Sequence, residues 1–169
     1  HPGRMERFYT KIVGTPVYID SPRPLTTVKD VIMDPEQGKL LAFIVNQSKN
    51  LVIMPMDILS WAEVIHIHNS DVIIDAKEVL RIEEVQKGNI RVFRSRVETK
   101  SGKYLGKVYD LSIDSGTFML QKLFVAKDLL GLFRYDSRII SAKNILEILP
   151  DKIVVKEDLK MIKEVESER

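Results

Sequence analysis

The sequence predicts an all-β fold made of two tandem small barrels. Two observations carry this prediction. A short phrase occurs twice, 80 positions apart, and most of the chain consists of short β-branched runs separated by turn residues. A chain of 169 residues has room for one ordinary domain or two small ones, and its 44% hydrophobic content is enough for a buried core.

The repeated phrase is VKDVIMD, from Val28, and VYDLSID, from Val108. One valine and two aspartates recur in it at identical spacing. Sliding the sequence by 80 positions extends the match without a gap from 11/91 to 45/125. Further on, Ile58-Leu59 matches Ile145-Leu146 at a shift of 87, so the second copy has gained seven residues in between. The shift then returns to about 80, where 72–74 matches 153–155 and 82–85 matches 162–165.

The repeat predicts two domains, residues 6–86 and 89–166, joined around Gly88. Residues 1–4 precede the first methionine and resemble the scar of an expression vector. No apolar run approaches the ~20 residues that span a bilayer, and no signal-peptide core is present. The chain contains no cysteine, which fits a reducing compartment. We therefore expect a cytoplasmic protein, and the short apolar runs predict no transmembrane segment.

Each copy is predicted to consist mostly of strands. DVIMD and LLAFIVN flank the turn from Pro35 to Gly38, which indicates a hairpin, and NLVIMPM, AEVIHIH and DVIID follow it. The second copy has VYDLSID, MLQKLFVA, SRIIS and KIVVK. So many short strands favour closed barrels, which leave no exposed edges. The two charged segments AKEVLRIEEV and KEDLKMIKEV end the copies as short helices or as return strands.

The stretch TVKDVIMDPEQGKLLAFIV resembles the signature of the PRC-barrel family, and LGKVYDLSID repeats part of it. The family occurs in the cytoplasmic part of the photosynthetic reaction-centre H subunit and in the C-terminal domain of the ribosome-maturation factor RimM. The resemblance implies two tandem six-stranded PRC-type barrels and a non-enzymatic module that docks onto a protein partner or larger complex. The first copy has Leu25-Thr26-Thr27 where the second has the more usual Leu105-Gly106-Lys107, so its entry turn is expected to differ.

Chemistry has few residues to build on. Asp30 and Asp34 share a strand face, as paired carboxylates for acid–base or metal chemistry do. The structural interpretation is preferred: Asp34 and Asp114 begin turns and bind local backbone N–H groups, while Asp30 and Asp110 lie on an edge or solvent face. No nucleophile elbow or phosphate-cradling loop is present, which predicts that the protein is not an enzyme and uses no cofactor.

His66 and His68 alternate with isoleucines and would share one strand face, a spacing that can bind a metal. The sequence indicates no third ligand, and the second copy has no equivalent. These histidines are therefore weak metal candidates, and a small-ligand or metal sensor is the third functional alternative.

Charge is uneven along the chain. Residues 1–86 carry nine Lys/Arg against twelve Asp/Glu, and residues 87–169 carry seventeen against twelve. The segment 87–107 holds Glu98 as its single acid, and its cations alternate with Phe93 and Tyr104, which predicts contact with phosphates or anionic lipid heads. A solvated strand face is the other interpretation. An RNA- or ribosome-associated factor, as a relation to RimM would imply, is the second functional alternative. Its candidate anion-binding residues are Arg91, Arg94, Arg96, Lys100 and Lys103.

The seven extra residues of the second copy fall around KDLLGLFRYDSR, where large apolar side chains surround Gly131. Such side chains need a cover, which the other barrel, a protein partner or a second copy of the chain in a homo-oligomer would supply. Trp61 is expected in the core or in a wall between the domains. The candidate protein interface consists of Leu129, Leu130, Leu132, Phe133 and Tyr135.

Overall fold

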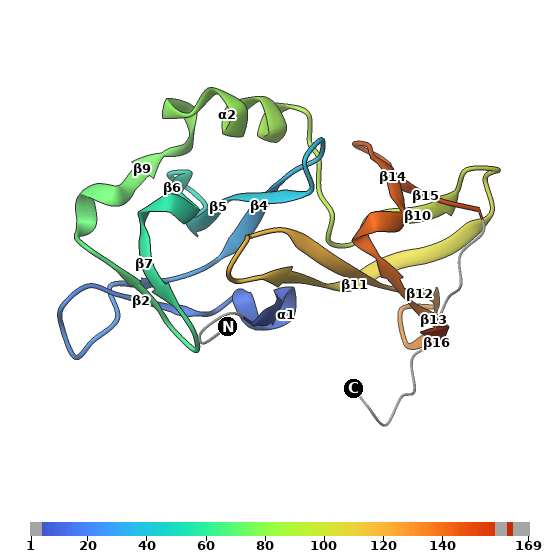
Figure 1. Cartoon of the computed structure of the whole chain (residues 1–169), viewed down its shortest axis with the longest axis horizontal. Coiled ribbons are helices and arrows are strands. Elements are labelled where there is room, and N and C mark those ends of the chain that lie inside the picture. Colours follow the sequence, from blue (N-terminus) through green and yellow to red (C-terminus); the bar gives the residue numbers. More distant parts are fainter. Residues whose placement is uncertain (1–4, 158–161, 164–169) are drawn as a thin grey trace.

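The computed structural model describes residues 5–157 and 162–163 of the chain, and its elements form three sheets. Figure 1 shows the first half on one side, under helix α2, and the second half on the other. The first half contains β1 (Glu6–Phe8), α1 (Tyr9–Ile12), β2 (Pro16–Tyr18), β3 (Thr26–Thr27), β4 (Asp30–Asp34), β5 (Lys39–Asn46), β6 (Leu51–Ile53), β7 (Ile58–Trp61), β8 (Ile65–Ile67), β9 (Ile73–Asp75) and α2 (Leu80–Lys87). The second half contains β10 (Arg96–Thr99), β11 (Tyr104–Asp114), β12 (Leu120–Leu129), β13 (Phe133–Ser141), β14 (Ile145–Ile148), β15 (Lys152–Val155) and β16 (Ile162–Lys163). Single 3-10 turns cover Pro55–Asp57, Ser70–Val72, Ala76–Glu78 and Ala142–Asn144.

The sheets have different sizes in the two halves. The first half forms two four-stranded sheets, in the orders β3-β2-β8-β7 and β4-β5-β6-β9. The second half forms one sheet in the order β14-β15-β10-β11-β12-β13-β16, which becomes eight-stranded because β1 also pairs with β11. The described residues are thus mostly β, in agreement with the predicted fold class.

Strand pairs of the first half recur in the second half at residue numbers that are 80 higher. Val17 faces Thr26 as Val97 faces Gly106, and Asp30 faces Ile44 as Asp110 faces Phe124. The irregularity in the β4–β5 register falls between Ile32 and Met33, and the β11–β12 register is irregular at the corresponding step. Both predicted hairpins, β4–β5 and β11–β12, are confirmed.

The part of the repeat alignment that matches residues 72–74 with residues 153–155 is wrong. Ile153 pairs in parallel with Val97, which is the place that Ile65 takes beside Val17. The counterpart of β15 is therefore β8 and not the run around Ile73, because β9 pairs with β6 at the other end of the fold. Runs of isoleucine and valine are interchangeable as patterns, and only their partners distinguish them.

Strand pairing closes none of the three sheets in the described part of the chain, so the two closed barrels that the sequence predicts are not observed. In the first half, no strand runs through residues 28–29, between β3 and β4, although the Val28 N–H donates to the Thr15 carbonyl (2.9 Å) and the Lys29 N–H donates to the Ile44 carbonyl (2.7 Å). In the second half the same stretch is continuous, since β11 runs for eleven residues and pairs with β10 and then with β12. One long bent strand therefore joins two sheet parts that the first half leaves separate.

The two charged terminal segments adopt different structures. In the first half the segment forms α2, which follows a capping box of Asp75 and Glu78 and buries Ile82 and Val85 against the β4–β5–β6 sheet. In the second half the backbone of β16 pairs with β13. The rest of that segment, residues 158–161 and 164–165, lies outside the described residues, as does the predicted scar at 1–4.

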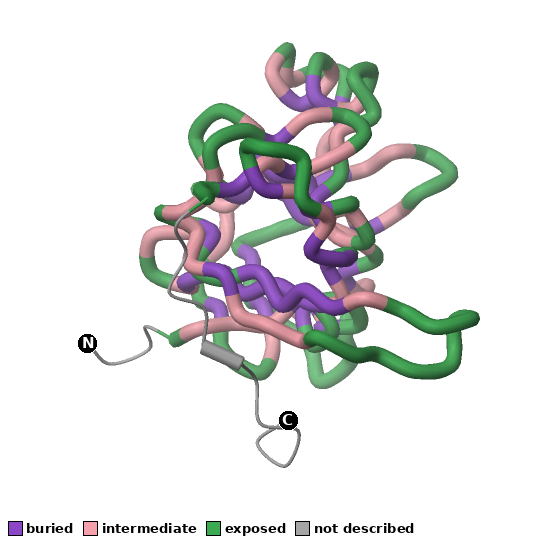
Figure 2. The backbone as a smooth tube through the Cα atoms, turned by 90° about the vertical axis from the view of Figure 1, so that its right-hand side faces the viewer, coloured by how far each residue is buried: buried purple, intermediate pink, exposed green. Residues whose placement is uncertain are grey.

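The two halves share one hydrophobic core, which contains residues of both. They also meet at their hairpin turns, where the Leu40 N–H donates to the Phe118 carbonyl (2.9 Å) and the Leu120 N–H donates to the Gly38 carbonyl (2.8 Å). Adding 80 to the residue numbers of the Leu40–Gly38 turn gives Leu120 and Phe118, so each bond is the counterpart of the other. The two turns are therefore related by an approximate two-fold axis. No helix among the described residues is long and apolar enough to cross a membrane. Figure 2 shows the buried backbone in the centre of the molecule and the exposed backbone around it.

Candidate interaction site

The seven extra residues of the second half lengthen one hairpin. Phe43 faces Ile53 in the first half, and Leu123 faces Ile140 in the second, which are shifts of 80 and 87. The additional residues therefore lie between β12 and β13 and extend this hairpin past the body of the protein. Figure 2 shows it as a long exposed hairpin at the lower right, with a buried base.

The end of this hairpin, which we call the tip, presents large apolar side chains to solvent. Leu132 N–H donates to the Leu129 carbonyl (3.0 Å) and closes a two-residue turn at Leu130 and Gly131, both of which have positive φ (+55° and +71°). Such turns favour Asn-Gly, because a leucine in this conformation is sterically disfavoured. Leu130 is nevertheless 86% exposed at the most protruding point. The tip is the predicted interface: Leu129, Leu130, Leu132, Phe133 and Tyr135.

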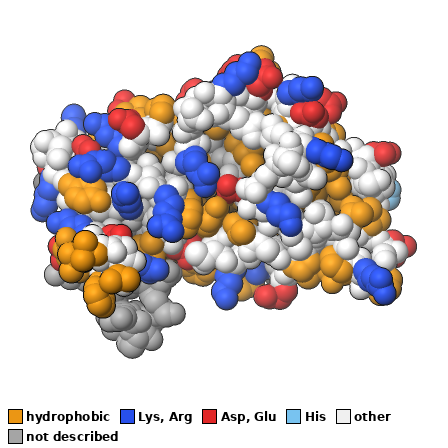
Figure 3. Space-filling view, turned by 180° about the vertical axis from the view of Figure 1, so that it is seen from behind, with side chains coloured by type: hydrophobic (Ala, Val, Ile, Leu, Met, Phe, Trp, Pro, Cys, Tyr) orange, Lys and Arg blue, Asp and Glu red, His pale blue; other side chains and the backbone are white. Residues whose placement is uncertain are grey.

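Polar contacts hold the stem of the hairpin behind the tip. The Arg134 guanidinium lies over the Tyr109 ring at 4.1 Å, and Lys127 lies 3.5 Å from the Asp136 carboxylate. The stem is thereby fixed to β11, while the tip extends beyond it. In Figure 3, hydrophobic side chains project at the lower left, at the end of the molecule that the second half occupies, among many Lys and Arg side chains.

Trp61 is both a core residue and part of the wall between the halves. It is buried, meets the Phe43 ring edge-on with centroids 5.1 Å apart, and stacks on the Phe118 ring at 6.0 Å. Phe118 belongs to the β11–β12 turn of the second half and has a φ of +63°. Trp61 therefore occupies both of the positions considered for it, the core and the wall between the domains.

The basic segment does not gather into one patch of free cations. Arg91 lies 3.4 Å from Asp30, Arg96 lies 2.6 Å from Glu98, and the Arg94 guanidinium lies over the Phe93 ring. Arg96 also covers the Tyr104 ring at 4.1 Å. The Arg96 hydrogen bond holds the pKa of the Glu98 carboxyl below its usual range. Lys100 and Lys103 are exposed in the turn between β10 and β11.

The two candidate histidines are exposed on the same face around β8, as the alternation predicts. The His66 Nδ1 lies 3.3 Å from the Ser60 hydroxyl, and its ring packs against Tyr18 with centroids 5.8 Å apart. Within residues 5–157 and 162–163, no three His, Cys, Asp or Glu side chains come together as a metal site would require.

The first aspartates of the repeated phrase both bind the helix α1, which lies beside β11 (Figure 1). Asp110 accepts hydrogen bonds from the Thr10 N–H (3.2 Å) and hydroxyl (3.0 Å), and Asp30 accepts one from the Tyr9 hydroxyl (2.8 Å). The expectation of an edge or solvent position is wrong for Asp110, which is 2% exposed. Burial is possible because the N-terminal segment covers it and supplies donors.

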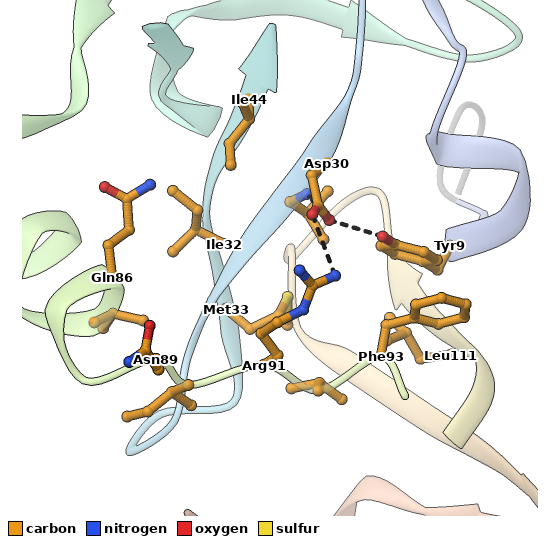
Figure 4. Close-up of a pocket in the computed structure, with 14 residues that line it drawn as sticks. Tyr9, Asp30, Ile32, Met33, Ile44, Gln86, Asn89, Arg91, Phe93 and Leu111 are labelled. Atoms are coloured by element: carbon orange, nitrogen blue, oxygen red, sulfur yellow. Dashed lines mark hydrogen bonds and ion pairs between the residues drawn. The ribbon is translucent and has the colours of Figure 1, made fainter. Parts of the chain in front are cut away.

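Asp30 also lines a pocket of about 280 Å³ at the junction of the halves. Figure 4 shows Tyr9 and Arg91 both reaching the Asp30 carboxylate, with Ile32 and Met33 also lining the pocket. Burial, reinforced by the hydrogen bond to Asp30, raises the pKa of Tyr9, so its hydroxyl remains a donor. Tyr9 and Arg91 thus both contact the Asp30 carboxylate, and the Tyr9 contact stabilises α1.

The second aspartates begin the hairpin turns. Asp34 accepts from the Glu36 and Gln37 N–H groups, and Asp114 accepts from the Thr117 N–H and hydroxyl. Asp34 also binds Arg81 of α2 at 2.9 Å. This hydrogen bond is the main cause that lowers the pKa of the Asp34 carboxyl.

Sequence reasoning did not find Tyr9, Thr10 or Arg81, because each acts on an aspartate at least 21 residues away and no local pattern marks it. Phe118 was detectable in principle. It stands 80 positions after Gly38, so the repeat itself shows an aromatic residue in one turn and none in the other.

Comparison with known proteins identifies part of the chain. No curated protein matches it closely enough to count as a relative. The family model described as PRC-barrel domain matches residues 5–81, which include β1 to β9 and the start of α2. The particular likeness to the reaction-centre H subunit and to RimM stays a prediction. Residues 5–81 of this chain belong to the PRC-barrel domain family.

Proposed function

We propose that the chain is a non-catalytic docking module that attaches to a protein partner through the tip of the β12–β13 hairpin. One observation carries the proposal: Leu130 is 86% exposed in a backbone conformation that disfavours leucine. An asparagine there would suit both the solvent and the turn. Leucine adds stability only when something covers it.

The neighbouring residues support the same conclusion. Leu132 and Phe133 are exposed beside Leu130, so the tip is a contiguous apolar surface and not a single stray side chain. The fold does not require the tip, because β5 and β6 form the corresponding hairpin without the seven additional residues. A protruding, dispensable and apolar hairpin end is typical of a binding element.

We further propose that residues 89–166 are a second PRC-type unit, so that the module is a tandem. The repeated strand partners and the repeated register irregularity support this. In this arrangement both units hold α1, through Asp30 and Asp110, and the second unit carries the binding element.

The alternatives receive less support. An RNA-binding role would use the segment 87–107, but Arg91 and Arg96 lie against acids and Arg94 against an aromatic ring. A metal sensor would need a third ligand beside His66 and His68. The absence of enzymatic activity is part of the proposal, and it is supported by the pairing of the Asp30 carboxylate with Tyr9 and Arg91.

The test is a site-specific cross-linking experiment in the native cytosol. A photoreactive residue in place of Leu132 is expected to capture one defined protein in a stoichiometric amount. Capture should persist in high salt, because apolar contacts are not screened. It should be lost in Leu130→Asp/Phe133→Asp and retained in Met56→Asp, which alters an equally exposed apolar side chain of the first half.

Two results would contradict the proposal. Capture that survives Leu130→Asp/Phe133→Asp would show that the tip is not the binding surface. Recovery of RNA that disappears with salt and in Arg94→Glu/Lys100→Glu would instead favour the nucleic-acid alternative, whose affinity falls steeply as salt rises.

A further inference from the structure

A groove lies between the halves at the place that corresponds, through the repeat, to the stack of Trp61 and Phe118. The groove has a volume of about 530 Å³ and is lined by the turn 35–38, by 119–121 at the base of the long hairpin, and by 141–148. Gly38 and Ile148 are the counterparts of Phe118 and Trp61, at shifts of 80 and 87. Trp61 and Phe118 stack on each other in the first position. In the second position neither ring is present, and the space between the same elements is open.

The turn that borders the groove has the geometry of its aromatic twin. The Gly38 N–H donates to the Asp34 carbonyl (2.8 Å), as the Phe118 N–H donates to the Asp114 carbonyl (2.7 Å), and the two φ angles are +64° and +63°. A Cβ added to Gly38 would meet no atom within 4 Å. The groove is therefore shaped to receive an aromatic or large aliphatic side chain that this turn itself lacks.

The chain exposes such side chains at the tip, which contains Leu130 and Phe133. The tip cannot reach its own groove. Leu120 lines the groove and Leu129 lies at the other end of β12, nine residues away, so the two sites are about 30 Å apart along one strand. An extended hairpin cannot fold back over that distance. The occupant must come from another molecule.

We infer that the tip of one copy of this chain inserts into the groove of a second copy; this rests on the proposed role of the tip as the docking element. Tip and groove lie at opposite ends of the same hairpin. Two hairpins placed side by side and antiparallel bring each tip to the other groove, and this reciprocal contact closes the association at two copies. The groove rim carries Glu147 beside Lys143, and its other acid, Glu36, is paired with Arg81 at 3.1 Å; the tip is followed by Arg134, so Glu147 would face a basic side chain.

The test is sedimentation velocity of the purified full chain, with two kinds of variant. Gly38→Phe recreates the Phe118 side chain at a matching φ and fills the groove. Gly38→Asn is its matched control, because asparagine tolerates positive φ and leaves the groove open. Leu130→Asp/Phe133→Asp removes the tip. Circular dichroism confirms that each variant is folded.

We expect the unaltered chain and Gly38→Asn to form dimers. Gly38→Phe and Leu130→Asp/Phe133→Asp should each weaken dimerisation by about 100-fold, as the loss of a central apolar anchor does. Mixing these two variants should restore a weaker heterodimer, because the intact tip of Gly38→Phe then meets the open groove of the other variant. Neither variant alone has a complete contact.

A monomeric unaltered chain at its highest soluble concentration would overturn the inference, and so would a dimer that persists in Gly38→Phe. Either result leaves the proposed docking function to be judged by the cross-linking experiment, which uses a different readout. Capture of a foreign protein that is lost in both Gly38→Phe and the tip variant would assign the groove to that partner and overturn self-association.

Discussion

The two halves of this chain have the same strand partners and differ in what they place at equivalent positions. The first half fills its junction with the Trp61–Phe118 stack and covers its sheet with α2. At the equivalent junction, Gly38 of the first half and Ile148 of the second half border an open groove, and the second half extends a hairpin into solvent. The comparison teaches that one half has become the structural frame, while the other has kept open space and exposed apolar surface.

The largest expected effect tests this difference at the junction. Trp61→Ala should lower the free energy of unfolding by about 3–5 kcal/mol, because it removes a buried ring that contacts both halves. Ile148→Ala should cost only about 2 kcal/mol, since its side chain already borders open space. Urea unfolding of both variants measures the two values. Equal costs would contradict the view that the second junction is unfilled.

A second contrast lies in the entry turns. Gly106 has a φ of +129°, and an added Cβ would lie 2.2 Å from the Ala126 carbonyl oxygen of the neighbouring strand. Gly106→Ala should therefore destabilise the protein by about 2–3 kcal/mol. The equivalent residue of the first half is Thr26, whose hydroxyl donates to the Val45 carbonyl at 3.3 Å, and Thr26→Ala should cost less than about 1 kcal/mol. Denaturant titration of Gly106→Ala and Thr26→Ala measures the two free energies of unfolding. A small loss of stability in both variants would contradict this account.

The two aspartates that bind α1 should also differ. Asp110 is buried, so Asp110→Ala leaves the Thr10 and Leu111 N–H groups without an acceptor and should cost about 2 kcal/mol. Asp30 borders the junction pocket, where water can replace its carboxylate, and Asp30→Ala should cost about 1 kcal/mol. Thermal unfolding compares them. A larger loss at Asp30 would mean that the Tyr9 contact, and not the burial of Asp110, anchors the N-terminal segment.

The contribution of the Asp34–Arg81 pair to stability is expected to depend on pH. Arg81 lowers the pKa of Asp34 in the folded state, so this pair stabilises the fold at pH values above the unfolded pKa of about 3.9. The contribution is lost as the pH falls through the lowered folded pKa. Arg81→Met should therefore lower the free energy of unfolding at pH 7, and the difference from the unaltered chain should shrink below about pH 4.

The neutral counterpart supplies the control for that experiment. Thr117 donates its hydroxyl to Asp114 at 2.8 Å, where the first half uses a guanidinium. Thr117→Val should cost about 1 kcal/mol at pH 7. Chemical denaturation across pH 3–7 measures both variants. An Arg81→Met penalty that stayed constant down to pH 3 would show that the side chain acts through packing on α2 rather than through its charge.

Local patterns predicted the hairpins and the repeat because those features depend on neighbours in sequence. The alternation around Asp30 and Asp110 and the Pro35–Gly38 turn were sufficient for that. The closed barrels were not observed, because closure depends on pairing between strands that are far apart in the sequence, and β propensity does not report this.

The candidate site was only half visible in the sequence. The tip could be named in advance, since apolar residues around Gly131 in an inserted segment are conspicuous. The groove could not, because its walls come from three segments and its form depends on side chains that are missing at Gly38 and Ile148. The alignment at a shift of 81 also failed, since valine and isoleucine runs match in several registers and only tertiary pairing selects one.

The smallest expected effect has the opposite sign. Phe118 and Leu130 both occupy the left-handed conformation, but Phe118 stacks on Trp61 while Leu130 contacts solvent. Leu130→Asn should therefore raise the free energy of unfolding by about 0.5–1 kcal/mol, because asparagine adopts this conformation at lower cost. Phe118→Asn should instead destabilise the chain, since the ring contact is lost. Differential scanning calorimetry measures both.

Leu130→Ala separates backbone strain from side-chain exposure in that comparison. Alanine keeps the unfavourable conformation and removes the apolar side chain, so it should leave stability nearly unchanged while weakening the interaction of the tip. If Leu130→Asn failed to stabilise the protein, the leucine would already be compensated within the isolated chain, and the tip would need no partner. If Leu130→Asn were more stable than the unaltered chain and no longer bound its partner, Leu130 would be a residue that lowers the stability of the hairpin and is needed for binding.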